Sequence, residues 1–166
     1  TGKALTLSNG QGATADRMFQ IMHGGTLKIQ GNASSTIIID GGAAFPEWSK
    51  EYGFTADQAA KKLKECIYCH GTLSLKYARI QNVCGTLDIN TGGAINIQSV
   101  WESKKACGTT TVENSIITKC MAPTGSALLL GTQNQGTSQT PENCKVTILN
   151  SEIFNCSSDG GGTVRS

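Results

Sequence analysis

The sequence contains few aromatic residues, few prolines and little excess charge. Phe, Trp and Tyr make up 5% of its 166 residues, and there are 3 prolines. Aromatic side chains dominate the cores of most globular domains, so their scarcity favours a narrow core filled by Val, Ile, Leu and Ala. The formal net charge is +2, and the lysines are scattered along the chain. We expect no nucleic-acid partner, because nucleic-acid-binding proteins carry a clustered basic footprint.

Long apolar runs are also absent. No stretch approaches the roughly 20 consecutive apolar residues that a transmembrane helix needs, so we expect no transmembrane segment in this chain. The chain begins at Thr1 without an initiator Met or a signal peptide, and it ends inside the strand-like segment 163–166. We therefore expect residues 1–166 to form one segment of a longer or processed protein.

What the chain has instead is an internal repeat. Residues 111–120 return as residues 147–156, at a constant separation of 36 residues. The fixed period predicts a stacked architecture, and the abundance of Val, Ile, Thr and Asn predicts that each unit is a turn of strands. The positions that match in kind are Val112/Ile148, Asn114/Asn150, Ser115/Ser151, Ile117/Ile153, Cys120/Cys156 and Gly125/Gly161.

The earlier part of the chain follows the same plan, with three short strands per turn and 20 glycines to supply the connections. Aligning the first two units sets His23 against His70, and it sets the strand that contains Cys66 and Cys69 against the strand that begins at Phe19. The prediction is an all-β parallel solenoid of roughly five to six coils, stacked at about 4.8 Å.

Short motifs in these repeats resemble a known family. Gly92-Gly93-Ala94-Ile95 resembles the Gly-Gly-Ala-Ile motif of adhesin-like and polymorphic outer-membrane proteins, and Gly125-Ser126-Ala127-Leu128 is a degenerate copy. Gly71-Thr72-Leu73-Ser74-Leu75 is similar to another motif of such repeats. The chain as a whole resembles the right-handed parallel β-helices of the pectate-lyase-like superfamily. The resemblance implies a right-handed coil and an extracellular or cell-surface location.

Asn114 and Asn150 lie at the corner between two predicted strands. Such a corner needs a left-handed backbone, which Asn tolerates better than most residues. The resemblance implies that these asparagines stack into a ladder of side-chain amides, while the alternative is a polar ligand site. Tyr77 replaces Asn in the preceding coil, so we expect the ladder to end there.

Two segments depart from the coil rhythm. In residues 43–65, Thr55 and Gln58 form a capping-box pattern ahead of an Ala/Lys/Leu run, which predicts a short helical excursion. Its aromatic residues could stack on sugar rings, or they could attach the helix to the solenoid wall. These candidate binding residues are Phe45, Trp48, Tyr52 and Phe54. The second departure is a polar loop insertion over 131–143, of the kind that carries binding in solenoids.

The sharpest local motif is Cys66-Ile67-Tyr68-Cys69-His70, because Cys-x-x-Cys-His is the attachment sequence of a c-type haem. The internal alignment disfavours haem, since it places both cysteines inside a strand, where the period of two would send their sulfurs to opposite faces. A zinc site is disfavoured too, because the chain has 2 histidines and no second Cys-x-x-Cys. We expect neither a cofactor nor a metal.

The chain has 7 cysteines. Cys120 and Cys156 share one position on adjacent coils, and Cys107 and Cys144 nearly do. Stacked positions lie about 5 Å apart, within the range that a disulfide allows. In an oxidising compartment we expect the disulfides Cys120–Cys156 and Cys107–Cys144. The alternative is that these residues stay reduced and pack as small apolar groups.

A catalytic site can also be sought. Polysaccharide-degrading β-helices, which this chain resembles, carry a close cluster of carboxylates, whereas its five aspartates include no adjacent pair. Glycoside hydrolysis needs two carboxylates about 5–10 Å apart. A lyase site could still be built from Asp40, Asp88 and Arg79.

These observations favour a non-catalytic module of the extracellular space or cell surface, with a glycan or a surface protein as its partner. The first alternative is a carbohydrate-active enzyme, a polysaccharide lyase or a glycoside hydrolase, whose remaining coils lie outside this chain. The second alternative is a spacer rod with no ligand of its own. Loss of binding on Trp48→Ala, without any turnover, would favour the module.

Overall fold

The computed structural model describes residues 6–8, 17–43, 65–85, 93–99, 108–122, 124–132, 144–158 and 162–165. These residues form short parallel strands that stack into three sheets. The six-stranded sheet contains β1 (Thr6–Ser8), β4 (Ile37–Asp40), β7 (Ala78–Cys84), β10 (Ile116–Ala122), β13 (Glu152–Phe154) and β14 (Ser157–Ser158). The five-stranded sheet contains β2 (Arg17–Ile21), β5 (Glu65–Cys69), β8 (Ile95–Ser99), β11 (Leu128–Thr132) and β15 (Val164–Arg165). The four-stranded sheet contains β3 (Thr26–Gln30), β6 (Thr72–Lys76), β9 (Thr109–Glu113) and β12 (Lys145–Leu149).

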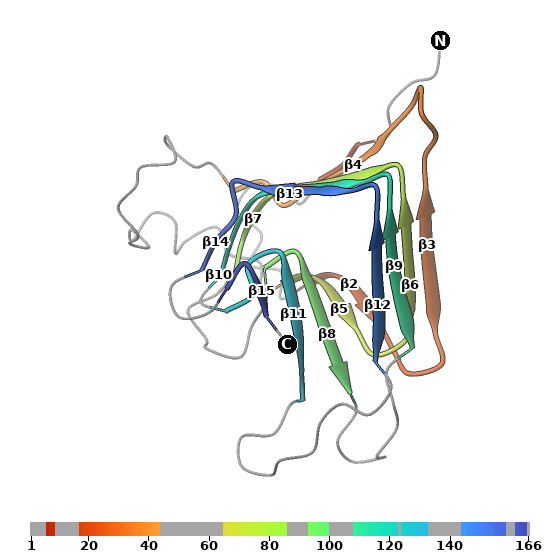
Figure 1. Cartoon of the computed structure of the whole chain (residues 1–166), viewed down its shortest axis with the longest axis vertical. Coiled ribbons are helices and arrows are strands. Elements are labelled where there is room, and N and C mark those ends of the chain that lie inside the picture. The colour runs from red at the N-terminus through yellow and green to blue at the C-terminus, as the bar shows by residue number, and fades with distance from the viewer. Residues whose placement is uncertain are drawn as a thin grey trace.

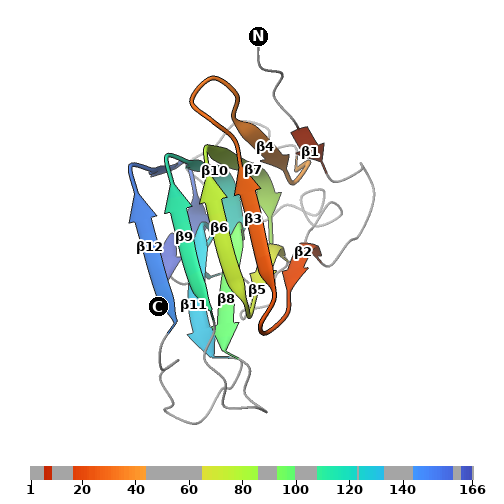
Figure 2. The same cartoon turned by 90° about the vertical axis from the view of Figure 1, so that its right-hand side faces the viewer.

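The chain winds through these sheets as a right-handed β-helix. In Figure 1 it runs counter-clockwise from β2 through β3 to β4, and Figure 2 shows that the later coils lie on the side nearer the viewer of Figure 1. This is the hand that parallel crossover connections favour. Four complete coils are described, with β1 preceding them and β15 following them. The predicted all-β parallel solenoid is therefore confirmed.

The repeat sets the register between coils. Ile148 of β12 lies opposite Val112 of β9, and Ile153 of β13 lies opposite Ile117 of β10, as the separation of 36 residues predicts. The interior is a set of aliphatic columns, of which Ile39, Ile80 and Ile117 form one. Each of these three side chains is at most 1% exposed. Burying such a side chain contributes about 1.5–3 kcal/mol, so a narrow stack can be stable without aromatic residues.

One feature of the strands differs from the prediction. In the five-stranded sheet the alternation of inward and outward side chains is interrupted, because two consecutive residues face the core. Cys66 and Ile67 are both fully buried core residues, and their successive amides donate hydrogen bonds to Gly93 O and Ala94 O of the next coil. The same doublet occurs in the other coils, at Met18/Phe19, Ala94/Ile95 and Ala127/Leu128.

The corner between the four-stranded and six-stranded sheets has the predicted left-handed backbone. Tyr77, Asn114 and Asn150 have φ angles of 49°, 48° and 48°. The hydrogen-bonded ladder at this corner, however, is built by serines. The Oγ of Ser115 accepts from Ala78 N at 3.1 Å, and the Oγ of Ser151 accepts from Ser115 N at 3.1 Å. The expected amide ladder is not seen among the described residues.

The amide ladder does not form because the Asn114 side chain bonds within its own coil. Asn114 Nδ2 donates to Glu113 Oε1 at 3.2 Å, so this amide bonds to its chain neighbour rather than to Asn150 in the next coil. A second set of left-handed residues lies at matching positions inside β7, inside β10 and directly after β13, at Asn82, Lys119 and Asn155. Asn therefore serves these corners through its backbone conformation.

The predicted helical excursion 43–65 and polar loop 131–143 fall almost entirely outside the described residues. Ala43 and Glu65 bound the first, and Gly131 and Thr132 belong to β11. In the described part of the chain, no helix has the length and apolarity required to cross a membrane.

Candidate functional site

The outer face of the four-stranded sheet is an accessible polar surface of the described residues. Each strand alternates between inward and outward side chains, as the period of two requires; the inward ones are apolar except for Thr110, and the outward ones are polar except for Leu149. β3, β6, β9 and β12 lie side by side in Figure 2. We call the outward residues the ladder face: Thr26, Lys28, Gln30, Thr72, Ser74, Lys76, Thr109, Thr111, Glu113, Lys145, Thr147 and Leu149. None of them is buried.

Register turns the ladder face into columns. Lys28, Ser74, Thr111 and Thr147 are consecutive partners across the four strands. Thr26 likewise lies opposite Thr72, and Thr109 lies opposite Lys145. Hydroxyl groups therefore recur about every 4.8 Å along the solenoid axis and about every 6.7 Å along a strand. The positions of these groups follow from the backbone, so they need little ordering when a ligand binds.

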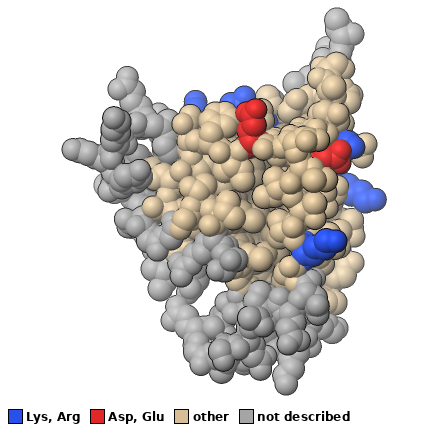
Figure 3. All heavy atoms as spheres, viewed as in Figure 1, with Lys and Arg blue, Asp and Glu red and all other residues tan. Residues whose placement is uncertain are grey.

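Most polar groups of the ladder face have no partner in the described residues. The exception is Lys76, whose Nζ lies 2.9 Å from Glu113 Oε1, and the hydrogen bond to Glu113 raises the pKa of this lysine. Ser74, Thr111 and Thr147 make no side-chain hydrogen bond there. Figure 3 shows few charged groups on the described surface in this view, and they lie at its top and right-hand side. The ladder face can therefore donate to and accept from a ligand.

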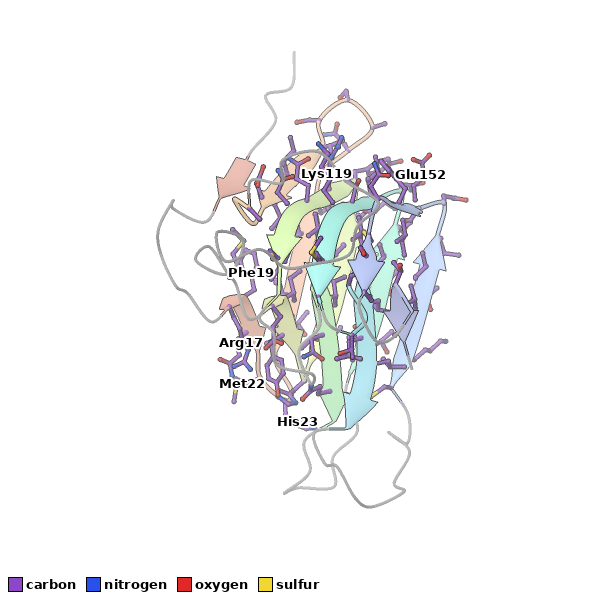
Figure 4. All side chains as sticks on the ribbon, turned by 90° about the vertical axis from the view of Figure 1, so that its left-hand side faces the viewer. Arg17, Phe19, Met22, His23, Lys119 and Glu152 are labelled. Atoms are coloured by element: carbon purple, nitrogen blue, oxygen red, sulfur yellow. The ribbon has the colours of Figure 1, made fainter. Side chains whose placement is uncertain are left out.

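The outer face of the five-stranded sheet carries a second set of polar residues, all of which are buried except for the partly exposed Arg17. We call it the buried polar cluster: Arg17, Glu65, Tyr68, His70, Asn96 and Gln98. Arg17 Nε forms an ion pair with Glu65 Oε1, and Asn96 Nδ2 donates to Glu65 Oε2 at 2.9 Å. The Glu65 side chain is 0% exposed, so its charge is stabilised by these two partners. Figure 4 shows Arg17 on this side of the molecule.

The aromatic half of the buried polar cluster stacks on Arg17. Its guanidinium carbon lies 3.8 Å from the centre of the Tyr68 ring, and Tyr68 OH donates to Gln98 Oε1 at 3.1 Å. His70 meets Tyr68 edge to face, with ring centres 4.5 Å apart. Burial lowers the pKa of His70 and raises that of Tyr68. Both side chains are therefore neutral at pH 7, and His70 Nδ1 is buried without a partner.

The predicted catalytic residues do not assemble into a described site. Asp40 serves a turn, because its carboxylate accepts from Gly42 N at 2.9 Å, Gln81 Nε2 at 2.7 Å and Asn82 Nδ2 at 3.0 Å. Arg79 lies opposite Ile38 and Ile116 in the register of the six-stranded sheet. Within the described residues it forms no ion pair with Asp40, and Asp88 lies outside them.

The cysteines of the Cys-x-x-Cys-His segment are both interior, which corrects the expectation that their sulfurs point to opposite faces. The inward doublet Cys66/Ile67 shifts the alternation by one residue, so Cys66 and Cys69 face the same core. Cys66 Sγ lies 3.9 Å from Met18 Sδ, and Cys69 Sγ donates to Gly71 O at 3.2 Å. Burial raises the pKa of Cys66 to about 12.

The register also corrects the alignment of the first two units. Cys69 pairs with Ile21, so the residue next to His70 in the preceding coil is Met22, while His23 lies in the turn beyond the strand. The turn between β2 and β3 has two more residues than the turn between β5 and β6, and this difference explains why the two histidines are not opposite each other. The expectation that haem and metals are absent remains a prediction; among the described residues, no group of three or more His, Cys, Asp or Glu could hold a metal ion.

Of the predicted disulfide partners, Cys120 and Cys156 lie on adjacent coils but both are free thiols. Cys107 lies outside the described residues, so its pairing with Cys144 remains a prediction. The four candidate aromatic residues Phe45, Trp48, Tyr52 and Phe54 also lie outside them. Sequence reasoning missed the ladder face, although its signal was the Thr or Ser that alternates with Leu in the four-stranded sheet, and it missed the pair of Arg17 and Glu65.

Comparison with known proteins adds no relative. No protein-family model matches this chain, and no curated protein and no solved structure gives a significant match.

Proposed function

We propose that this β-helix is a non-catalytic binding module of the extracellular space or cell surface, and that it recognises a glycan through the ladder face. We also propose that it belongs with the adhesin-like relatives of the pectate-lyase-like superfamily. The observation that carries the proposal is the partly exposed column of Ser74, Thr111 and Thr147, whose hydroxyls have no partner in the described residues.

Hydrogen-bond chemistry favours a polyhydroxylated ligand. A hydroxyl both donates and accepts, as a sugar hydroxyl does, and a regular array can meet successive residues of a linear chain. The solenoid supplies this array already ordered, which lowers the entropy cost of binding. A binding role also agrees with the state of Asp40, because both of its carboxylate oxygens accept hydrogen bonds from neighbouring groups.

The test is binding of the purified chain to a glycan array, with released sugar products quantified from the same incubations. We expect binding without products. The variant Thr111→Ala/Thr147→Ala removes two neighbouring hydroxyls and should weaken binding by roughly tenfold, because a hydrogen bond contributes about 0.5–1.5 kcal/mol. Glu152→Gln is the matched control, since this exposed residue belongs to the six-stranded sheet.

The possible outcomes distinguish two claims: that the chain binds a glycan, and that it does so through the ladder face. If Trp48→Ala abolishes binding and the threonine variant does not, the glycan module stands and the ladder face is wrong. Sugar products in the same incubation would overturn the non-catalytic assignment and direct mutagenesis to Asp40, Asp88 and Arg79. Absence of binding to any glycan would contradict the proposed function itself.

A further inference from the structure

Cys120 and Cys156 face each other across two coils. Thr118 pairs with Phe154 and Met121 pairs with Ser157, so the residues between them place Cys120 opposite Cys156. Neighbouring strands bring such Cα atoms to about 4.8 Å, inside the 4.4–6.8 Å range that a disulfide requires. Both residues are free thiols in this structure. The backbone therefore needs no rearrangement to join them.

The two thiols lie in different surroundings. Cys120 is 0% exposed, with its sulfur 3.3 Å from Thr118 O, whereas Cys156 is only half-buried, with its sulfur 3.4 Å from Phe154 O. Burial raises the pKa of Cys120 well above its usual value. A hydrogen bond from Cys120 lowers the pKa of Cys156. The thiolate is the reactive form of cysteine, so Cys156 is the nucleophile of the pair.

We propose that Cys156 is an oxidation-sensitive thiol and that Cys120 is its resolving partner, so that a hydroperoxide converts the pair into a disulfide between coils. The Cys156 thiolate attacks one peroxide oxygen, the O–O bond breaks and hydroxide leaves, which gives a sulfenic acid on Cys156. The Cys120 sulfur then attacks the Cys156 sulfur, Cys120 gives up its proton, and water leaves. Two thiols lose two electrons, and hydrogen peroxide is reduced to two waters.

The position of the pair gives oxidation a structural consequence. Cys156 follows β13, in the last complete coil, where Ile148, Leu149 and Phe154 are 39%, 48% and 41% exposed. This coil has a described partner on one side only along β12 and β13. The disulfide would close a loop of the chain from Cys120 to Cys156, and it would link the last complete coil covalently to the preceding coil. Oxidation is therefore expected to slow the fraying of the solenoid at this end.

The experiment treats the reduced protein with hydrogen peroxide in the presence of dimedone, which traps sulfenic acids, and locates the products by tandem mass spectrometry. In the wild type we expect a disulfide between Cys120 and Cys156. Because Cys144 shares a tryptic peptide with Cys120, fragment ions must assign the bond to Cys120. In Cys120→Ser we expect dimedone on Cys156, several-fold above the wild type, and in Cys156→Ser we expect neither product.

Hydrogen exchange of the 145–158 segment supplies a second measurement. It reports how often the last coil opens, and each variant is compared with itself before and after peroxide, so a less stable variant can still be interpreted. Peroxide should lower its deuterium uptake in the wild type and leave it unchanged in Cys156→Ser. The proposal is overturned if Cys156 stays reduced while another cysteine is oxidised, or if dimedone labels Cys156 equally in the wild type and in Cys120→Ser. It makes no use of a ligand, so it stands or falls independently of the glycan module.

Discussion

The outer faces of the four-stranded and five-stranded sheets are both polar, but their polar groups differ in what they contact. In the buried polar cluster, Glu65 is fully buried and bound by Arg17 and Asn96. On the ladder face, Thr111 and Thr147 are accessible and have no side-chain partner in the described residues. Position in a strand is the same in both cases, since each residue alternates with a core side chain.

The difference teaches that a polar residue's type does not by itself reveal its role in a solenoid. Groups that satisfy one another hold neighbouring coils together, because breaking such a pair strands a buried polar atom. Accessible polar groups that bond to no other group of the protein contribute little to its stability, and they are available to a ligand. The Glu and Arg of the five-stranded sheet would attract attention in a search for catalytic residues, but their contacts assign them to stability.

Removing the carboxylate of the buried polar cluster should have the largest effect on stability. Glu65→Ala leaves Arg17 and Asn96 without their acceptor, and we expect a loss of about 3 kcal/mol in the free energy of unfolding. Urea titration measures it. Glu65→Gln keeps an acceptor for Asn96 and should cost less. If Glu65→Ala lowered the free energy of unfolding by no more than an ordinary surface substitution does, the cluster would not hold the coils together.

The serine ladder comes next. Ser115→Ala removes the acceptor of Ala78 N, and both residues are buried, so we expect a loss of about 1–3 kcal/mol. Ser151→Ala is the matched control, because it makes the same contact one coil later, at a more exposed position. We expect a smaller loss there, measured by the same urea titration. Equal losses would mean that burial does not set the strength of the ladder.

A pH dependence should distinguish the buried polar cluster further. Because burial lowers the pKa of His70 below 6.5, the unfolded chain takes up the proton first, and protonation favours unfolding. The stabilisation is present above pH 6.5 and is lost as the pH falls toward the lowered value. His70→Gln should show a shallower loss over this window. Comparing the two proteins cancels the titration of the carboxylates, and identical pH profiles would contradict the assignment.

The smallest effect on stability is expected on the ladder face. Thr111→Ala/Thr147→Ala should change the free energy of unfolding by no more than about 0.5 kcal/mol per site, since both residues are partly exposed and have no side-chain partner in the described residues. Thermal unfolding tests this before the glycan assay is interpreted. A large destabilisation would mean that these threonines support the sheet, and the contrast between the two faces would disappear.

Much of the fold could be predicted from the sequence, because a repeat reports the same environment several times. Asn114 and Asn150 predicted the left-handed corner, and the pairs Val112/Ile148 and Ile117/Ile153 predicted the register. The inward doublet was not predicted, since Cys66-Ile67 alone cannot be told from the start of an ordinary alternating strand. Its only sequence signal is that apolar doublets recur at this point in every coil.

The candidate site was harder to predict for a physical reason. Arg17 and Glu65 lie 48 residues apart, well outside the separation of 36 residues, so no repeat connected them. The alternating hydroxyls were visible as Thr72 and Ser74 in Gly71-Thr72-Leu73-Ser74-Leu75, but their availability depends on the absence of a partner among the described residues. Alternation predicts which side chains point outward, while pairing has to be observed.

The corners of this solenoid offer a route to engineering. Between the four-stranded and six-stranded sheets, Tyr77 alone joins β6 to β7, and Asn114 and Ser115 join β9 to β10. The connections around the five-stranded sheet vary instead: residues 85–94 link β7 to β8, and residues 123–127 link β10 to β11. Foreign peptides grafted into these variable connections should therefore be displayed at successive coils, while the array of hydroxyls keeps its spacing. The solenoid could then serve as a scaffold that holds the grafted peptides at regular intervals.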